Sequence, residues 1–262
     1  MDVSKRKLYE SEHLHEGEKL AIWQEGDQRW MSFGEVTQSV ICLSDRSKLS
    51  AEFSQTMMAF LLFVEDFTRV LMLGMGGAAI PRFFHHHDKN IRGDIVERSE
   101  EVIKLANDYF YFSELEKFWS IHNCDAREYL SRSNNNTYDL ILVNIADGQS
   151  PPNWLTQNEE LEQFRKLLMR NGVIVFNLVT TKSEDFLKHL KNIRAVFSKQ
   201  TLCLSVPGHL NVIIFAFKQP PKFRNKEHIK SRLEDLTKKW GLEFDQIIQQ
   251  VFEENSLGSG II

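Results

Sequence analysis

Residues 70–83 read VLMLGMGGAAIPRF, and this stretch decides the fold. It opens with a short apolar run typical of a buried strand, and residues 74–77 follow as Gly-Met-Gly-Gly. These glycines let the chain reverse sharply and let a ligand approach the backbone, because no side chains obstruct either. The helix expected beyond the turn starts with unpaired backbone N–H groups. The stretch therefore predicts a strand–turn–helix unit that binds a nucleotide-type ligand.

Strands and helices alternate from this unit onward. The expected strands cover residues 69–73, 91–97, 119–122, 139–143, 173–178, 201–206 and 212–217. The expected helices cover residues 50–63, 78–84, 99–111, 127–131, 158–170 and 184–197, and the helix over 158–170 ends at Asn171-Gly172. The alternation predicts an α/β fold with a mainly parallel seven-stranded sheet covered by helices on both faces.

The rest of the chain is expected to form two appendages to this Rossmann-like domain, which we assign to residues 51–219. Residues 1–50 carry short apolar segments separated by turn formers, a pattern that predicts a small antiparallel β unit. Residues 220–262 are charged and show apolar residues at helical spacing, which predicts a C-terminal helical extension.

Composition disfavours several classes of protein. The chain has 262 residues, of which 42% are hydrophobic, and 32 Lys+Arg against 36 Asp+Glu give a net charge of -4. Proteins that bind nucleic-acid phosphates are usually basic, so we expect no nucleic-acid partner. The apolar run at residues 57–64 is far too short to span a bilayer, and residues 1–7 lack the apolar core of a signal peptide. We therefore expect a cytoplasmic protein with no membrane partner.

Two acidic residues lie where an adenosyl group would need them. Glu97 ends the second strand about 20 residues after the glycine turn, and a carboxylate there accepts hydrogen bonds from both ribose hydroxyls. Asp125 follows the short third strand and is placed to accept from an adenine amino group. Together with the glycine turn, these residues predict an adenosyl-binding site.

The glycine turn also fits a different ligand. Gly74-x-Gly76-x-x-Ala79 matches the dinucleotide fingerprint, so a nicotinamide oxidoreductase is an alternative. The last two expected strands are joined through Pro207-Gly208 as a hairpin, which is the ending of class I methyltransferase-like Rossmann folds. The hairpin and the acid after the third strand favour the adenosyl ligand.

Several segments, in this order, resemble the spermidine synthase family, and more closely its bacterial spermidine synthase-like branch. They are residues 70–83 (VLMLGMGGAAIPRF), 94–97 (DIVE), 124–126 (CDA) and 138–143 (YDLILV), and the resemblance covers residues 15–218. It implies transfer of an aminopropyl group from decarboxylated S-adenosylmethionine to a diamine, by direct displacement at carbon. The positions that it assigns to donor binding are Gln38, Gly74, Gly76, Gly77, Glu97, Asp125 and Ala126.

The chain departs from the family pattern around the reacting group. Gly77 stands where the family has an Asp that helps to hold the donor's amine, and Phe53 lies near the position of its active-site Tyr. Asn144 replaces the catalytic base and cannot take up a proton at neutral pH. Asp147, the second acid of that segment, remains, and an alignment shifted by one or two positions would make it the base. Asn144 and Asp147 are therefore the candidate catalytic residues.

These departures leave the reaction open. Each charge-assisted hydrogen bond contributes roughly 1.5–3 kcal/mol, so three losses predict weak diamine binding. Intact S-adenosylmethionine suits Gly77, because an Asp would repel its carboxylate and the N–H groups at the helix start would bind it. The first hypothesis is a spermidine synthase-like transferase that binds S-adenosylmethionine or its decarboxylated form. The alternatives are an S-adenosylmethionine-dependent methyltransferase of unknown substrate, which needs positioning more than a base, and a non-catalytic nucleoside-binding protein.

The expected partner is a small molecule, either a polyamine or an unknown acceptor. The resemblance also allows a homodimer, since members of that family are commonly dimeric or larger. His85-His86-His87 does not predict a metal site, because three adjacent helical residues point in different directions. No metal is expected elsewhere.

Overall fold

The computed structural model describes residues 4–15, 18–145 and 150–262. The strands near the N-terminus are β1 Arg6–His15, β2 Glu18–Glu25, β3 Gln28–Phe33 and β4 Val36–Cys42. The remaining strands are β5 Arg69–Leu73, β6 Arg92–Val96, β7 Trp119–His122, β8 Tyr138–Val143, β9 Leu168–Val179, β10 Thr201–Ser205 and β11 Asn211–Phe217.

The helices lie mainly between the strands from β5 onward. The α-helices are α1 Glu52–Met57, α2 Ala79–His87, α3 Glu100–Phe110, α4 Ala126–Arg132, α5 Asn158–Leu167, α6 Ser183–Val196, α7 Lys226–Lys230, α8 Leu233–Trp240 and α9 Phe244–Glu254. The 3₁₀ helices are η1 Met58–Leu62, η2 Phe112–Leu115 and η3 Asn153–Thr156.

Among the described residues, seven strands form a central sheet in the order β10-β11-β9-β8-β5-β6-β7. Neighbours from β9 to β7 pair in parallel, and β11 pairs antiparallel with both β9 and β10. β5 lies between β8 and β6, so the chain leaves β5 at the point where the strand order reverses. Ligands of open α/β sheets bind at such a point, beyond the carboxyl ends of the strands. The predicted class I methyltransferase-like fold is confirmed.

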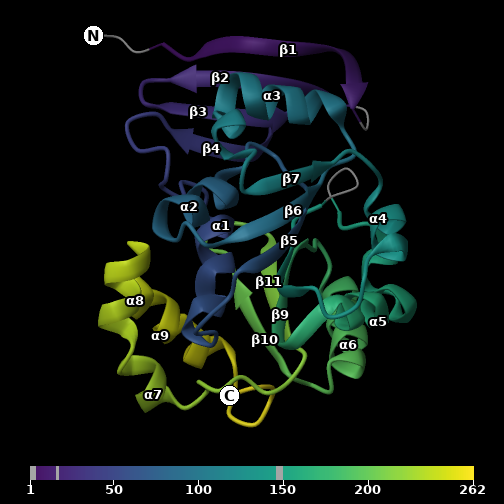
Figure 1. The fold of residues 1–262 in the computed structure, drawn as a ribbon, viewed down its shortest axis with the longest axis vertical. Coiled ribbons are helices and arrows are strands. Elements are labelled where there is room, and N and C mark those ends of the chain that lie inside the picture. The colour runs from purple at the N-terminus through teal and green to yellow at the C-terminus, as the bar shows by residue number, and fades with distance from the viewer. Residues whose placement is uncertain (1–3, 16–17, 146–149) are drawn as a thin grey trace.

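Each face of the central sheet is covered by its own helices. One face packs against η1, α2, α3, α8 and α9, and the other against α4, α5 and α6 (Figure 1). β5 is buried at four of its five residues because it has helices on both faces. Its continuous apolar run, Val70–Leu73 in the sequence, is therefore what a central parallel strand requires.

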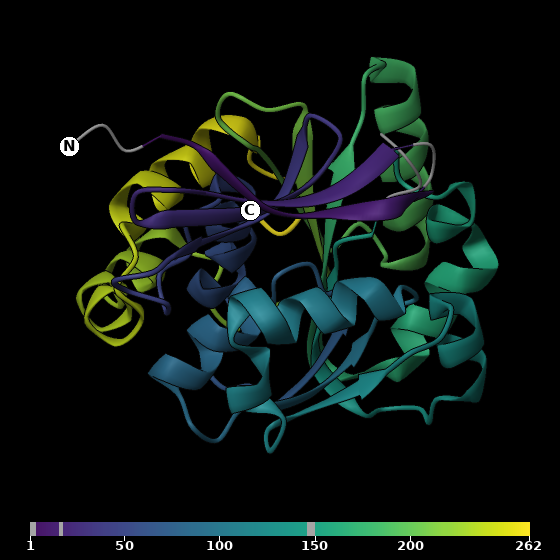
Figure 2. The same cartoon turned by 90° about the horizontal axis from the view of Figure 1, so that it is seen from above.

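Strands β1–β4 form a separate antiparallel N-terminal sheet at one end of the molecule (Figures 1 and 2). It contacts α3, where the Arg29 guanidinium donates to the backbone oxygen of Tyr109 over 2.7 Å. It also contacts the start of α2 through β4. The β unit predicted for residues 1–50 is thus present and lies against the helices that follow β5 and β6. The division into three domains stays a prediction.

The outer edge of β10 is covered by the end of α9. The Asn255 side chain accepts a hydrogen bond from the backbone N–H of Cys203 at 3.0 Å and donates one to its carbonyl oxygen at 2.8 Å. The Glu254 carboxylate accepts from the backbone N–H of Ser205 at 2.7 Å. Side chains thus pair with the backbone of an edge strand, in place of another strand.

Two predicted helices differ from those observed. The helix expected over residues 50–63 is a short α1 followed by the tighter turns of η1. The helix expected over residues 158–170 ends at Leu167, and β9 begins at Leu168. Leu168 pairs with Tyr138 of β8, and Asn171-Gly172 lies inside β9 rather than ending a helix. The next pair with β8 is Val173 with Leu140, and a register shift separates it from the pair at Leu168, so residues 169–172 form an irregular start of β9.

Within the described part of the chain, none of the helices combines the length and the apolar character needed to cross a membrane.

Candidate functional site

The glycine turn between β5 and α2 is shaped by a close backbone approach. Gly74 has φ +85°, and a Cβ atom there would lie 2.2 Å from the backbone oxygen of Asn144. Gly76 has φ +48°, a conformation that side chains rarely adopt. Ala78 also has a positive φ, of 53°, at the start of α2. The turn therefore requires glycine at residue 74 for contact with the end of β8, and favours it at residue 76.

Glu97 follows β6, and its carboxylate faces the glycine turn. One carboxylate oxygen accepts from the backbone N–H of Met75 at 3.0 Å, and the other accepts from that of Ser99 at 2.9 Å. Burial raises the pKa of Glu97, and the N–H groups of Ser99 and Met75 counteract part of that rise. Both oxygens keep further lone pairs, so the fixed carboxylate is suited to accept from a pair of vicinal hydroxyls.

Asp125 and Ala126 begin α4. The Asp125 carboxylate accepts from the backbone N–H of Arg127 at 2.8 Å and is exposed, so it caps the helix. Asn123 donates to the backbone oxygen of Glu97 at 2.9 Å, which connects the β7–α4 loop to the end of β6. The loops that carry Glu97 and Asp125 are thus joined.

Gln38 lies on β4, beside the glycine turn. A Cβ atom on Gly76 would lie 3.7 Å from the backbone oxygen of Gln38 and 3.6 Å from the Cβ of Ser39. The N-terminal sheet therefore forms one wall of the turn, and the backbone of Gln38 is close to the predicted donor position. The roles assigned to Gln38, Glu97, Asp125 and Ala126 remain predictions.

The space beside Gly77 is filled. A Cβ atom at Gly77 would lie 2.7 Å from Cδ1 of Phe110 and 2.8 Å from Oγ of Ser39. Phe110 is fully buried, so its ring has little freedom to move away. An aspartate at this position would require the packing of α3 against β4 to rearrange.

A buried cation lies behind the same residue. The Arg82 guanidinium donates to the backbone oxygens of Gly77 and Phe110, the latter over 2.7 Å. Arg82 is 7% exposed, and burial lowers its pKa to about 9. At neutral pH it therefore carries a positive charge on the inner side of the glycine turn.

Asn144, at the end of β8, belongs to a ladder of amide side chains. Its side-chain oxygen accepts from Nδ2 of Asn177 at 2.8 Å, and the side-chain oxygen of Asn177 accepts from Nδ2 of Asn211 at 2.8 Å. The ladder crosses from β8 to β9 and β11 on one face of the sheet. Because the Asn144 oxygen is already an acceptor within the ladder, its amide nitrogen is the group left to donate to a ligand.

The other candidate near the reacting group is outside the described residues. Asp147 belongs to residues 146–149, of which the structure describes nothing, so its role stays a prediction. Phe53 lies on α1 and packs, partly buried, against the core. The structure therefore brings together the glycine turn, Glu97 and the end of β8, with Asp125 on a connected loop.

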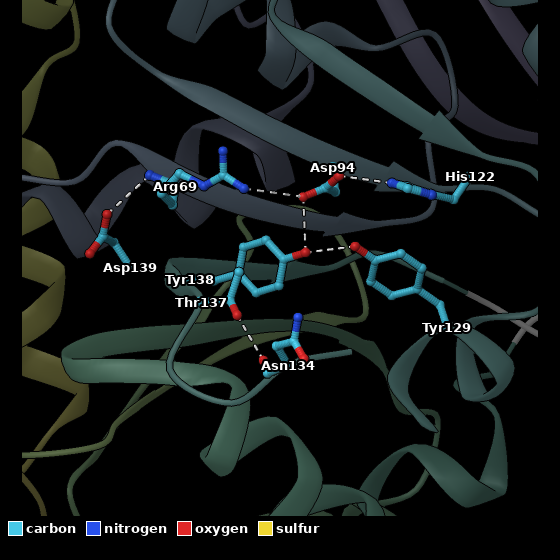
Figure 3. Close-up of polar contacts among 8 residues, drawn as sticks. All are labelled: Arg69, Asp94, His122, Tyr129, Asn134, Thr137, Tyr138 and Asp139. Carbon is cyan, nitrogen blue, oxygen red and sulfur yellow. Dashed lines mark hydrogen bonds and ion pairs between the residues drawn. The ribbon is translucent and has the colours of Figure 1, made fainter. Parts of the chain in front are cut away.

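The sequence analysis missed an acid in the middle of β6. Asp94 accepts from Nε2 of His122 at 2.8 Å and from the hydroxyl of Tyr138 at 2.9 Å, and the Arg69 guanidinium lies 3.8 Å away (Figure 3). Tyr138 in turn contacts the hydroxyl of Tyr129 at 2.6 Å. A carboxylate in the middle of a short strand of the central sheet was the available signal.

The histidine run at the end of α2 makes separate contacts. Nδ1 of His87 lies 2.8 Å from the backbone oxygen of Lys239, and the His85 ring packs on Phe118 with centroids 4.0 Å apart. No cluster of three or more possible metal ligands is found among the residues that the structure describes.

Comparison with known proteins gives concordant matches. A model of the spermine/spermidine synthase domain matches residues 53–227. The polyamine aminopropyltransferase of Chromobacterium violaceum is 29% identical over 245 residues, which cover 92% of this chain and 92% of that protein.

Solved structures agree in fold. A probable spermidine synthase from Corynebacterium glutamicum superposes with a TM-score of 0.73 at 19% identity, over 88% of this chain and 86% of its own. Human methyltransferase-like protein 13, solved in complex with SAH, superposes with a TM-score of 0.67 at 21% identity, over 73% of this chain and 93% of its own. At such identities these structures establish the fold and nothing further.

Proposed function

Because the chain belongs to the spermine/spermidine synthase domain family, we propose that it binds intact S-adenosylmethionine and transfers the methyl group to an acceptor. The donor would occupy the cleft beyond the carboxyl ends of β5, β6 and β7. Its sulfonium would supply the methyl group, and the protein would supply binding and orientation.

The donor's nucleoside part fits groups that the chain fixes in place. The carboxylate of Glu97, held by two backbone N–H groups, would accept from the ribose hydroxyls. Asp125 would lie on the adenine side, and the close backbone approach at Gly74 leaves the turn free of side chains. These features support an adenosyl ligand whichever group is transferred.

The packing at Gly77 carries the choice of intact S-adenosylmethionine. Decarboxylated S-adenosylmethionine ends in an ammonium group, which the family holds with an acid at this position. Here Phe110 and Ser39 fill the space for such an acid, and the Arg82 cation lies behind the turn. Positive charge and backbone N–H groups favour the carboxylate of intact S-adenosylmethionine over an ammonium group.

Methyl transfer also agrees with Asn144. Displacement at a sulfonium methyl needs mainly in-line positioning, so a side chain that cannot act as a base is compatible with it. The amide nitrogen of Asn144 would donate to an oxygen or a nitrogen lone pair of the acceptor and orient it.

Aminopropyl transfer is the second candidate, supported by one specific observation. The Chromobacterium violaceum relative, named a polyamine aminopropyltransferase, matches this chain over almost its whole length. The reaction would require a base for the attacking amine, and Asp147 is the remaining acid of that segment.

Calorimetric titration with S-adenosylmethionine, its decarboxylated form and methylthioadenosine tests the proposal. We expect S-adenosylmethionine to bind most tightly and methylthioadenosine, an uncharged thioether, to bind more weakly. Tighter binding of the decarboxylated form, strengthened further by putrescine, would support aminopropyl transfer instead. Binding of none of the three would refute the adenosyl site itself.

A further inference from the structure

A pocket of about 360 Å³ opens beside the Asp94 network, between α4, the end of β7 and the start of β8. Its walls include His122, Tyr129, Thr137 and Tyr138. This volume lies within the range for small-molecule sites, at its lower end. The pocket is separate from the glycine turn, and nothing in the proposed transfer reaction uses it.

The hydrogen bonds of the network fix the direction of each proton. The Asp94 carboxylate can only accept, so Tyr138 must donate to it. Tyr129 must then donate to the oxygen of Tyr138, which is 2.6 Å away. Burial raises the pKa of both tyrosines, so they remain protonated at neutral pH. The Tyr129 oxygen therefore has only lone pairs left for a ligand.

Two more hydroxyl groups on the pocket wall have also donated their only proton within the protein. Ser133 donates to the backbone oxygen of Tyr129 at 2.7 Å, and Thr137 donates to that of Asn134 at 2.7 Å. Each hydroxyl has one proton, so both oxygens offer only acceptor capacity to the pocket. Hydroxyl groups that ordinarily serve as donors or acceptors are here restricted to accepting.

Aromatic rings and charge complete the environment. The His122 and Tyr129 rings lie 4.7 Å apart between centroids, and Nε2 of His122 contacts the Asp94 carboxylate. The charge of Asp94 is offset by Arg69 at 3.8 Å, and that of Arg132, a largely exposed residue of the wall, by its ion pair with Glu128. The ring faces and oxygen lone pairs of the wall therefore attract a positively charged hydrogen-bond donor.

We infer that this pocket binds a small organic ammonium ion, which donates to the oxygens of Tyr129 and Thr137. Cys124, on the pocket wall, adjoins Asp125 in the sequence, and Tyr129 lies one turn beyond Asp125 on α4. An ammonium ion bound here would contact the helix whose first residues form the predicted adenine side of the donor site.

Binding of n-butylammonium, followed by calorimetry and saturation-transfer NMR, tests this inference. The matched probes are 1-butanol, which lacks the charge, and butyrate, which reverses it. We expect n-butylammonium to bind about tenfold more tightly than 1-butanol, and butyrate not to bind. Equal binding of n-butylammonium and 1-butanol would overturn the inference.

Variants locate the site. Tyr129→Phe should weaken n-butylammonium binding about tenfold, and Tyr111→Phe, outside the pocket, should leave it unchanged. If Tyr129→Phe melts at a lower temperature than the wild type, Thr137→Val serves as the second variant that should weaken n-butylammonium binding. Undiminished binding by folded Tyr129→Phe or Thr137→Val would refute the assignment. Glu97→Ala should bind n-butylammonium as the wild type does. Loss of n-butylammonium binding in this variant would place the ion in the proposed donor site and overturn the inference of a separate pocket.

Discussion

The two halves of the proposed donor site use their polar groups differently. In the nucleoside half, Glu97 is fixed by backbone N–H groups and retains lone pairs for a ligand. In the transfer half, the space beside Gly77 is filled by Phe110, and the oxygen of Asn144 is bound within the amide ladder. In the proposed site, one half would keep an acid for the nucleoside, whereas the other has packing and amides at the positions where the resembling family has acids. Neighbouring side chains thus stabilise the residues of the transfer half in place.

Removing the acid of the nucleoside half should have the largest effect. Glu97→Ala would delete the two proposed charge-assisted hydrogen bonds to the ribose, so the affinity for S-adenosylmethionine should fall about a hundredfold. Calorimetric titration measures it. Glu100→Ala, an exposed acid at the start of α3, is the matched control and should bind normally. Equal affinities for the two variants would mean that Glu97 does not hold the ligand.

Restoring the family's acid at Gly77 tests whether the transfer half is closed by packing. Gly77→Asp places new atoms against Phe110 and Ser39, and overpacking of this kind costs about 1–3 kcal/mol of the free energy of unfolding. Urea denaturation measures that loss. Thr181→Asp is the control, because it introduces the same carboxylate at an exposed position. A Gly77→Asp protein as stable as the wild type would show that the space is easily vacated.

Restoring an acid at Asn144 should be tolerated better. Asn144→Asp still accepts from Asn177, so we expect a change in unfolding free energy below about 1 kcal/mol. The new charge should also improve binding of decarboxylated S-adenosylmethionine several-fold relative to the intact form. Asn177→Asp is the control, because it replaces the donor to Asn144 and should destabilise more. Greater instability of Asn144→Asp would show that the ladder runs in the opposite direction.

The smallest expected effect is on the pH dependence of donor binding. Burial raises the pKa of Glu97, and only its ionised form accepts from both ribose hydroxyls. Affinity should therefore decrease as the pH is lowered through this raised pKa, beginning at a higher pH than an ordinary Glu near about 4.3 would cause. Titrations across acidic pH check this, and Glu97→Gln should remove the dependence. An unchanged dependence in Glu97→Gln would assign it to another group.

The fold of the central sheet could be predicted from local patterns. β5 has the predicted bounds, because a continuous apolar run followed by turn residues determines a buried parallel strand. The short edge strand β7 also has the predicted bounds, although its residues are only partly apolar and partly buried. The start of β9 could not be predicted, since only Leu168 pairs with β8 there and residues 169–172 lie in a register shift before the pair at Val173. Over residues 6–12, β1 is mostly exposed or half-buried and carries several charged residues, so it lacks the alternation that marks a half-buried strand.

The candidate site divides in the same way. Gly74 and Glu97 could be predicted from their local spacing in the sequence. In the structure, the Glu97 carboxylate accepts a hydrogen bond from Met75, the residue after Gly74. The filling of Gly77 by Phe110 depends on how α3 packs against β4, which no local pattern encodes. The amide ladder joins residues from three strands, and its members are separated by more than thirty positions. Such contacts become visible only when the strand order is known.

The cover over β10 has a consequence for how the protein is made. Translation releases the chain from its N-terminus, so β10 leaves the ribosome well before Glu254 and Asn255, which pair with its outer edge. During that interval the nascent sheet exposes an unpaired strand edge, the feature that recruits other chains into aggregates. The final turn of α9 thus protects the sheet from aggregation late in synthesis, and deleting it should first lower the yield of newly synthesised protein.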